Sequence, residues 1–302
     1  MLKKLRIEIT SVQKLICKDG SNLKGAIRKM KTRKILGIVG AVMTLGLILA
    51  GCGNKNTDNS VKSIQDKKTL VVGTSADYAP FEFPVMQNGN KKIVGYDMMV
   101  AQKIADNLGV KLKIENIEFP SLISELKNNK VDMVLAGMAA TNQRKKVVAF
   151  SNPYYTVGNV LLVQKKDADS FNKVADVKGK SIGVQQSSTQ AAIAKSQLKG
   201  SNIVTEGVLT GLTTELSQGK LSGVVVEREV ADNYVKQYPE KYAIAKVKLS
   251  TPKQARYFNI AIRKSDKALL KRVNKEIAKL QKSGELTQMF KKAQDLQAKN
   301  NK

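Results

Sequence analysis

The chain has 302 residues, of which 42% are hydrophobic, so it is long enough for two domains and a targeting segment. It has no histidine, and Cys17 and Cys52 both precede the predicted folded region, which excludes a Ser/His/Asp triad, a Cys/His pair and a cysteine-rich metal site. A formal net charge of +27 favours anionic partners, but scattered lysines without interleaved aromatic residues indicate a solvated basic surface rather than a nucleic-acid interface.

The N-terminal part of the chain has the order of a bacterial signal peptide. A basic run at 30–34 precedes an apolar stretch at 35–50. The sequence Leu49-Ala50-Gly51-Cys52 resembles the lipobox of bacterial lipoproteins, which implies cleavage before Cys52 and its diacylation. The alternative is an uncleaved transmembrane helix, and it is disfavoured because the apolar stretch is shorter than the roughly 20 residues that span a bilayer.

Two further stretches flank this signal. Residues 1–29 do not fit a standard signal peptide, which suggests that translation starts at Met30. We therefore assign residues 1–51 to an extra segment plus the lipoprotein signal peptide. Residues 52–67 are polar, rich in Asn, Lys and Ser and without apolar periodicity, so they predict a flexible tether.

From residue 68 onward, β-branched runs alternate with helical patterns. Strands are predicted at 69–73, 111–117, 131–135, 181–184 and 223–226, and helices at 100–108, 122–128, 189–198, 229–237, 269–280 and from Thr141. Gly109 follows the first of these helices, where glycine commonly caps a helix. The alternation predicts an α/β fold with mostly parallel sheets, in which ligands bind beyond the carboxyl ends of strands.

Several motifs, in order along the chain, resemble those of the family 3 extracellular solute-binding proteins, the amino-acid receptors of ATP-driven importers. The matching segments are 72–83, Gly95-Tyr96-Asp97, 122–126, Asp132, Thr141-x-x-Arg144, 150–155, 183–185 and the stretch from Gly219-Lys220 to Glu227. The resemblance covers nearly all of residues 68–292.

This resemblance implies a two-lobed, periplasmic-binding-protein-like α/β fold with two hinge-crossing strands and the ligand in the interlobe cleft. Lobe 1 is expected at 68–155 and 254–302, and lobe 2 at 160–248. Ligand binding is then expected to close the cleft by a hinge motion.

The resemblance implies that Arg144 binds the α-carboxylate of an amino acid. A guanidinium offers paired donors that match a carboxylate, whereas an arginine early in a helix is by itself more often a surface charge. Thr141 is expected to add its hydroxyl or amide at the helix N-terminus, where an anion is favoured, and its alternative role is a plain N-cap.

Residues of the second lobe are expected to complete the site. By resemblance, Ser188 and Thr189 contact the same carboxylate, although helix capping explains them equally well, and the family usually has glycine where Ser187 stands. Glu227 ends a strand where the family carries an acid, more often aspartate, for the ligand α-ammonium. A solvated carboxylate after a strand is the alternative for Glu227.

The remaining candidates concern the ligand side chain. Tyr78 and Phe119 are expected to form its aromatic wall, although core packing explains such residues as well. The family uses backbone and small side chains at the positions of Gly137, Met138 and Ala139. Two further polar residues are expected to tune side-chain choice, Glu82 toward a polar or cationic ligand and Gln185, whereas Asp97 is expected to serve structure.

These observations predict an extracytoplasmic, lipid-anchored receptor that captures one free amino acid, polar or basic, and delivers it to the membrane subunits of an ABC importer. We expect a monomer that is not an enzyme and that has no cofactor, no metal site and no nucleic-acid partner. Two alternatives stay open: an enzyme on the same fold, such as a dehydratase of a small carboxylate with Glu227 as acid or base, and a wall- or nucleic-acid-binding protein driven by charge.

Overall fold

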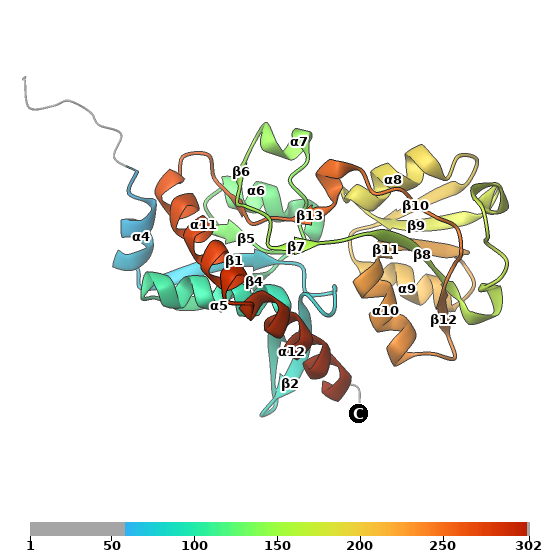
Figure 1. Cartoon of the computed structure of the whole chain (residues 1–302), viewed down its shortest axis with the longest axis horizontal. Helices are drawn as coiled ribbons and strands as arrows, with labels where there is room; N and C mark the ends of the chain where they lie inside the picture. The colour runs from blue at the N-terminus through green and yellow to red at the C-terminus, as the bar shows by residue number, and fades with distance from the viewer. Residues whose placement is uncertain (1–57, 301–302) are drawn as a thin grey trace, which may run out of the picture. The chain divides into compact units, whose positions relative to one another are not determined.

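The computed structural model describes residues 58–300, and two five-stranded sheets organise them into two α/β lobes (Figure 1). The predicted signal peptide, Cys52 and the first residues of the predicted tether lie outside the described residues.

The sheet of lobe 1 has the strand order β4-β1-β5-β14-β6. Its strands are β1 (Thr69–Thr74), β4 (Lys111–Asn116), β5 (Met133–Val134), β6 (Ala149–Phe150) and β14 (Ala261–Ile262). Strand β1 pairs in parallel with β4 and β5, whereas β14 pairs antiparallel with β5 and β6. A hairpin of β2 (Phe83–Gln87) and β3 (Asn90–Val94) extends from the same lobe.

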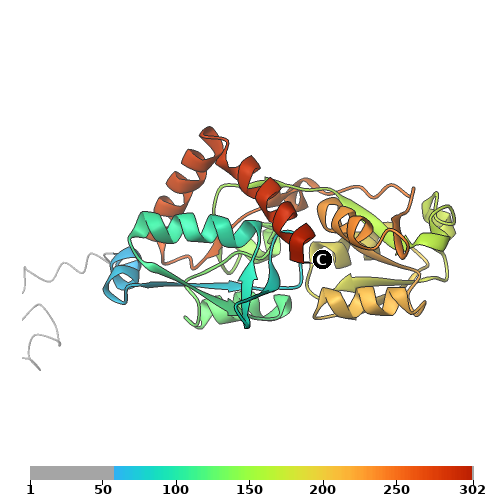
Figure 2. The ribbon, with the colours of Figure 1, turned by 90° about the horizontal axis from the view of Figure 1, so that it is seen from below.

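Helices cover both faces of this sheet. They are α4 (Ser60–Asp66), α5 (Tyr96–Leu108), α6 (Leu122–Lys127), α7 (Asn142–Lys145), α11 (Lys267–Lys282) and α12 (Glu285–Asn300), with short 3-10 turns η2 (Phe119–Ser121) and η5 (Lys253–Ala255). Helices α5, α11 and α12 pack together on one face and α6 lies on the other (Figure 2). The predicted cap of α5 is confirmed, since Gly109 adopts the left-handed conformation with φ 71°.

Lobe 2 has the strand order β10-β9-β11-β8-β12. Its elements are β8 (Asn159–Gln164), η3 (Lys165–Asp167), η4 (Val174–Val177), β9 (Ser181–Gln185), α8 (Thr189–Gln197), β10 (Asn202–Glu206), α9 (Leu209–Ser217), β11 (Gly223–Glu227), α10 (Arg228–Gln237) and β12 (Tyr242–Ile244). Strands β9, β10 and β11 run parallel, and β8 and β12 are antiparallel to their neighbours. The expected α/β alternation is therefore confirmed, although each sheet is mixed rather than mostly parallel.

Two segments carry the chain between the lobes. Strand β7 (Tyr155–Thr156) leads out of lobe 1 toward β8, and β13 (Tyr257–Phe258) pairs antiparallel with β7 on the way back (Figure 1). Two crossing strands were expected from the family resemblance. The residue boundaries predicted for the two lobes stay a prediction.

The predicted tether is wrong for residues 60–66, because these residues form α4. Ile64 is 2% exposed and packs in the core of lobe 1, with partly buried Val61 on the same helical face. The Asp58 carboxylate accepts a hydrogen bond from the backbone of Ala268, and the Ser60 hydroxyl accepts one from Leu269 at 3.2 Å. The Val61-x-x-Ile64 spacing was the helical signal that the polar composition obscured.

Within residues 58–300, no helix has both the length and the apolar character needed to cross a bilayer.

Candidate ligand-binding site

A cavity lies where the carboxyl ends of strands from both lobes face each other. Residues that follow β1 and β5 line it from lobe 1, and residues at the ends of β9 and β11 and the start of α8 line it from lobe 2. The lining residues are Ser75, Asp77, Tyr78, Glu82, Phe119, Ala136, Gly137, Arg144, Gln185, Ser188, Thr189, Gln190 and Glu227. Seven of the ten predicted ligand-binding residues are among them.

Arg144 reaches from lobe 1 across the cleft. Its Nη1 donates to the Ala139 carbonyl at 2.8 Å, and its Nη2 donates to the Ser187 carbonyl of lobe 2 at 2.9 Å. The guanidinium carbon lies 5.2 Å from the centre of the Phe119 ring, a cation–π distance. Burial lowers the pKa of Arg144 to about 10, which still leaves it charged at neutral pH.

The other predicted residues near Arg144 hold its loop in place and do not face the cavity. Thr141 is the N-cap of α7, and its hydroxyl accepts a hydrogen bond from the Arg144 amide at 3.3 Å. Ala139 supplies a carbonyl, and the Met138 side chain, 1% exposed, packs in a core cluster. Thr141, Met138 and Ala139 therefore do not line the cavity.

Gly137 is the predicted small residue that does line the cavity. Its φ of 54° strongly favours glycine, and the Phe258 ring would lie only 3.1 Å from an added Cβ. Its N–H donates to the Asp97 carboxylate at 3.0 Å, which holds the loop after β5 in place.

Lobe 2 presents the N-terminus of α8 to the same space. Ser188 is the N-cap, and its hydroxyl accepts from the Ala191 amide at 3.1 Å. Thr189 is the first residue of the helix. Ser187 adopts φ 60°, the left-handed conformation that glycine takes most easily, which gives a physical reason for the glycine that the family usually has there.

Glu227 faces Tyr78 across the cleft. The Tyr78 hydroxyl donates a hydrogen bond to Glu227 Oε2, so residues from both lobes meet directly. Glu227 is 3% exposed, and burial raises its pKa to about 7 although the tyrosine hydrogen bond opposes that shift. Gln190 Nε2 lies nearby and donates to the Asn159 side chain at 2.8 Å.

Glu82 and Asp97 form a buried carboxyl pair beneath the cavity. Glu82 is 1% exposed and lines the cavity, and burial together with neighbouring Asp97 holds the pKa of Glu82 well above its usual range. Burial also raises the pKa of Asp97 to about 6, although it accepts from Gly137 and from the Tyr154 hydroxyl at 2.8 Å. No donor among residues 58–300 reaches Glu82 Oε2 or Asp97 Oδ1, so a proton on the pair, an ordered water molecule or a ligand cation is expected to satisfy them.

The turn that carries Tyr78 and Glu82 is held against α5. Tyr78 and Glu82 form a β-bridge, and the Phe81 carbonyl accepts from the amide of Asp97 at 3.0 Å. Gly95 has φ 129°, and a Cβ there would overlap the Phe81 carbonyl. This close approach fixes the Glu82 side chain relative to Asp97.

Sequence reasoning missed Asp77, which joins the two lobes. Its Oδ2 accepts from the Leu209 amide at 2.5 Å, at the first residue of α9, and its Oδ1 accepts from the Ser75 hydroxyl at 3.1 Å. Gln185 of lobe 2 lies 3.5 Å from Asp77 Oδ2. Its place three residues after β1, beyond the carboxyl edge of the sheet, was the signal that could have identified it.

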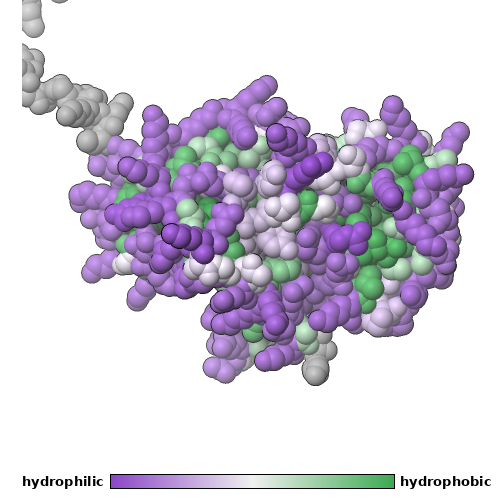
Figure 3. Space-filling view, in the orientation of Figure 1, coloured by the Kyte–Doolittle hydropathy of each residue, from purple (hydrophilic) through white to green (hydrophobic). Residues whose placement is uncertain are grey.

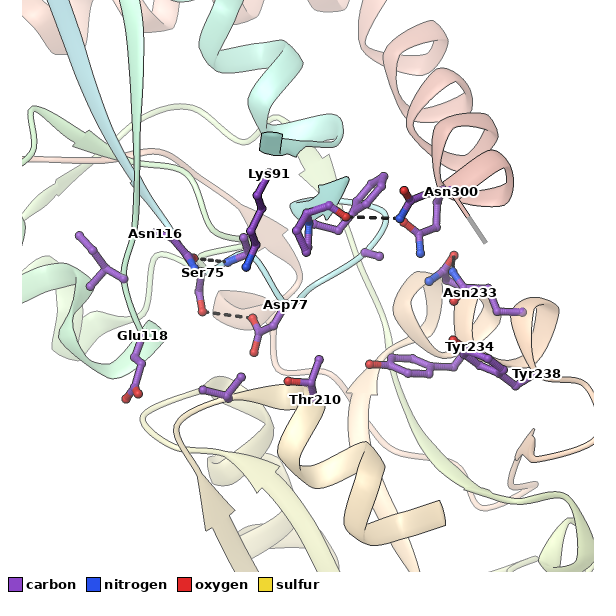
Figure 4. Close-up of a pocket in the computed structure, with 18 residues that line it drawn as sticks. Ser75, Asp77, Lys91, Asn116, Glu118, Thr210, Asn233, Tyr234, Tyr238 and Asn300 are labelled. Carbon is purple, nitrogen blue, oxygen red and sulfur yellow. Dashed lines mark hydrogen bonds between the residues drawn. The ribbon is translucent and has the colours of Figure 1, made fainter. Parts of the chain in front are cut away.

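A second pocket, of 460 Å³, opens outward from this site (Figure 4). It shares Ser75 and Asp77 with the inner cavity, and Tyr234 and Asn233 of α10 stand on its opposite side. Asp77 therefore separates the inner cavity from an outer vestibule.

Two residues of the inner cavity have supporting contacts of their own. Phe119 stacks beside Arg144, and Gln185 donates to the Gly207 carbonyl at 3.1 Å.

Within the described part of the chain, no cluster of three Cys, Asp or Glu side chains is placed to hold a metal ion.

A family model described as bacterial extracellular solute-binding proteins, family 3, matches residues 70–294. The chain belongs to this family. The match spans both lobes and confirms the resemblance inferred from the motifs.

Known members of the family agree with this assignment. The arginine-binding extracellular protein ArtP of Bacillus subtilis is 34% identical over 85% of this chain and 96% of its own length. The L-cystine-binding protein TcyJ of Escherichia coli is 26% identical over 85% of this chain and 93% of its own. Both relatives are named for the amino acid that they bind, which supports a receptor over an enzyme on the same fold.

Solved structures share the fold. The substrate-binding protein AbpA of Streptococcus pneumoniae bound to L-arginine superposes with a TM-score of 0.74 at 35% identity, and the match covers 78% of this chain and 98% of that one. The two-lobed architecture expected from the sequence is thereby confirmed.

Proposed function

We propose that this chain captures a cationic amino acid, arginine foremost, in the interlobe cavity and delivers it to an ABC importer. One observation carries the choice of a cation: three carboxyl groups and a single guanidinium line the cavity. A zwitterion pairs with one charge of each sign, so two carboxyl groups remain, and a positive side chain balances one of them.

The α-carboxylate of the ligand is assigned to Arg144 and the N-terminus of α8. The two guanidinium nitrogens that now donate to the Ala139 and Ser187 carbonyls form a pair of parallel donors that suits a carboxylate. The amides of the first turn of α8, next to Ser188 and Thr189, add partial positive charge from the other lobe.

The α-ammonium is assigned to Glu227. Burial raises its pKa to about 7, and Glu227 forms no ion pair with a lysine or arginine among the described residues, so an ammonium group would supply a direct partner. Tyr78 orients this carboxylate from lobe 1 through its hydroxyl.

The ligand side chain is assigned to the Glu82 region, with Tyr78 and Phe119 as its walls. Glu82 has a carboxyl oxygen that no donor among the described residues reaches, whereas both Asp77 oxygens already accept hydrogen bonds. A guanidinium at Glu82 would favour the ionised form of this carboxyl group, which burial and Asp97 disfavour in its absence. The arginine bound by AbpA and named for ArtP supports the same ligand class.

We further propose that the mature chain begins at Cys52, is lipidated there and remains on the extracytoplasmic face of the cell membrane as a monomer. Support comes from the order of basic, apolar and small residues before Cys52. The lobe boundaries 68–155 with 254–302, and 160–248, are part of the same proposal.

Isothermal titration of the purified protein with arginine, lysine, ornithine, histidine, cystine and glutamine tests the ligand class. We expect the tightest binding for arginine, with the ligand recovered chemically unchanged. Tighter binding of glutamine than of arginine would refute the cationic assignment, and consumption of the ligand would indicate an enzyme.

A further inference from the structure

Helix α11 carries a concentrated positive charge that the ligand site does not use. Its 16 residues contain six Lys or Arg against one acidic residue, Glu276, which is 3% exposed. Lys267, Lys271, Lys275 and Lys279 recur every fourth residue, so they form one stripe along the exposed side of the helix. The α11 basic face is defined as the exposed residues Lys264, Lys267, Lys271, Arg272, Lys275, Lys279 and Lys282.

Acidic groups around the start of this face are already engaged. Asp266 pairs with Arg263 at 2.7 Å, and Asp132 pairs with Lys67 at 2.6 Å. Hydrophilic side chains project over the part of lobe 1 where α11 lies (Figure 3). Lys279 pairs with Glu276 at 3.5 Å, whereas the other basic residues of the face within α11 form no ion pair with the described residues, so most of the positive charge of the face is not cancelled locally.

The chain enters the folded region next to this face. The Asp58 carboxylate accepts from Ala268 in the first turn of α11, and Ser60 accepts from Leu269. Six residue steps separate Cys52 from Asp58, and even a fully extended chain of that length spans at most about 20 Å. With the proposed anchor at Cys52, the start of α11 stays within roughly two Debye lengths of the headgroups.

We propose that the α11 basic face docks on anionic phospholipid headgroups and orients lobe 1 on the membrane that anchors the chain. The short distance between α11 and the membrane depends on the proposed lipid anchor at Cys52, whereas the positive charge of the face does not. Each Lys or Arg near an anionic surface strengthens binding about fivefold, so a stripe of several residues suffices for weak, reversible docking.

The docking face and the ligand site are separate. None of the α11 basic residues lines the inner cavity or the outer vestibule, so their charge can be changed without touching the ligand site. Residues 58–302 contain all three core clusters and form one unit, which makes this part of the chain suitable for study without Cys52.

Vesicle co-sedimentation of residues 58–302 tests the proposal. The vesicles contain phosphatidylcholine alone or with about one third phosphatidylglycerol, in about 0.1 M salt. The test variant carries Lys267→Gln, Lys271→Gln, Arg272→Gln and Lys275→Gln. The matched control removes the same charge from lobe 2 with Lys178→Gln, Lys180→Gln, Lys195→Gln and Lys199→Gln, which are exposed lysines without a side-chain partner among the described residues.

We expect the unaltered protein to bind only the anionic vesicles, the α11 variant to bind at least about 100-fold more weakly, and the lobe 2 variant to change less than about fivefold. Both variants should bind arginine as before, which verifies their folding. Absent binding to anionic vesicles, or equal losses in the two variants, would overturn the proposal. Neither outcome bears on the receptor function, because calorimetry measures arginine binding independently and the protein tested lacks Cys52.

Discussion

The cleft faces of the two lobes differ in what they offer a ligand. Lobe 1 contributes two long charged or ionisable side chains, Arg144 and Glu82, and the aromatic residues Tyr78 and Phe119. Lobe 2 contributes one carboxylate, Glu227, and the N-termini of two helices, α8 and α9. Under the proposed ligand assignment, lobe 1 carries the groups that select a ligand side chain, whereas lobe 2 carries groups that would complete the site on closure.

This division gives each lobe a different expected response to mutation. Changes in lobe 1 should alter which ligand binds, except at Arg144, which we propose to bind the α-carboxylate common to all amino acids. Changes that affect only closure should weaken the binding of every ligand by a similar factor. The reason is that the apparent affinity for each ligand is proportional to the fraction of the protein that is in the closed conformation.

The largest effect is expected for Arg144→Ala. Two charge-assisted hydrogen bonds contribute about 1.5–3 kcal/mol each, so the affinity for arginine should fall roughly 100- to 10,000-fold in titration calorimetry. Arg144→Lys should recover only part of this loss, because an ammonium cannot form the paired contact.

Arg228→Ala is the control for this variant. Arg228 follows Glu227 directly, but its side chain is 56% exposed and lies 3.9 Å from Asp232. Affinity within about twofold of the unaltered protein is expected, since exposed pairs contribute little. Retained arginine affinity in Arg144→Ala would contradict the assignment of the α-carboxylate.

Glu82→Gln is expected to change selectivity. Loss of one charge-assisted contact should weaken arginine about 10- to 100-fold and leave neutral glutamine nearly unchanged, so the ratio of the two affinities is the measurement. Glu118→Gln, which removes a carboxylate from the outer vestibule, is the matched control and should leave that ratio unaltered. An equal loss for both ligands would assign Glu82 to structure instead.

Affinity for arginine should rise with pH. Burial raises the pKa of Glu227 to about 7, and the ligand ammonium needs the ionised form, so binding releases a proton. Because the ionised fraction of such a group increases about tenfold between pH 6 and pH 8, the association constant should increase by about the same factor. The Glu82–Asp97 pair, whose pKa values are also raised, adds to this increase for arginine but not for glutamine.

Calorimetry in two buffers of different ionisation enthalpy measures this proton release directly. A smaller pH dependence in Glu227→Gln would verify the source. An affinity that falls between pH 6 and pH 8 would be incompatible with a carboxylate partner for the α-ammonium.

The architecture was predictable because its signals are local. The β-branched run at 69–73, the helix closed by Gly109 and the apolar period of 269–280 all correspond to elements of the structure. Antiparallel β8, β12 and β14 were not recognisable as such, because strand direction depends on pairing with distant segments. Helix α4 was missed because one buried isoleucine among polar residues gives too weak a period.

The ligand site was predictable where a motif fixed the residue and unpredictable where closure creates the contact. Arg144, Tyr78 and Glu227 were predicted from motifs, and the structure places them around one cavity, whereas their roles toward a ligand stay a prediction. Asp77 acquires its partner only when lobe 2 approaches, since Leu209 lies 132 residues away in the sequence. No local pattern contains that information.

The smallest effect is expected for Asp77→Asn, which tests whether this residue acts through closure. Its carboxylate caps α9 across the cleft, and loss of a charged cap costs about 0.5–1.5 kcal/mol, so each ligand should bind about 2- to 10-fold more weakly. Arginine and glutamine should lose the same factor, and small-angle scattering should report a larger open fraction at equal ligand occupancy. A loss of affinity for arginine alone would instead make Asp77 a direct partner of the cationic ligand side chain. Selection for a positively charged ligand would then lie entirely in the segment after β1.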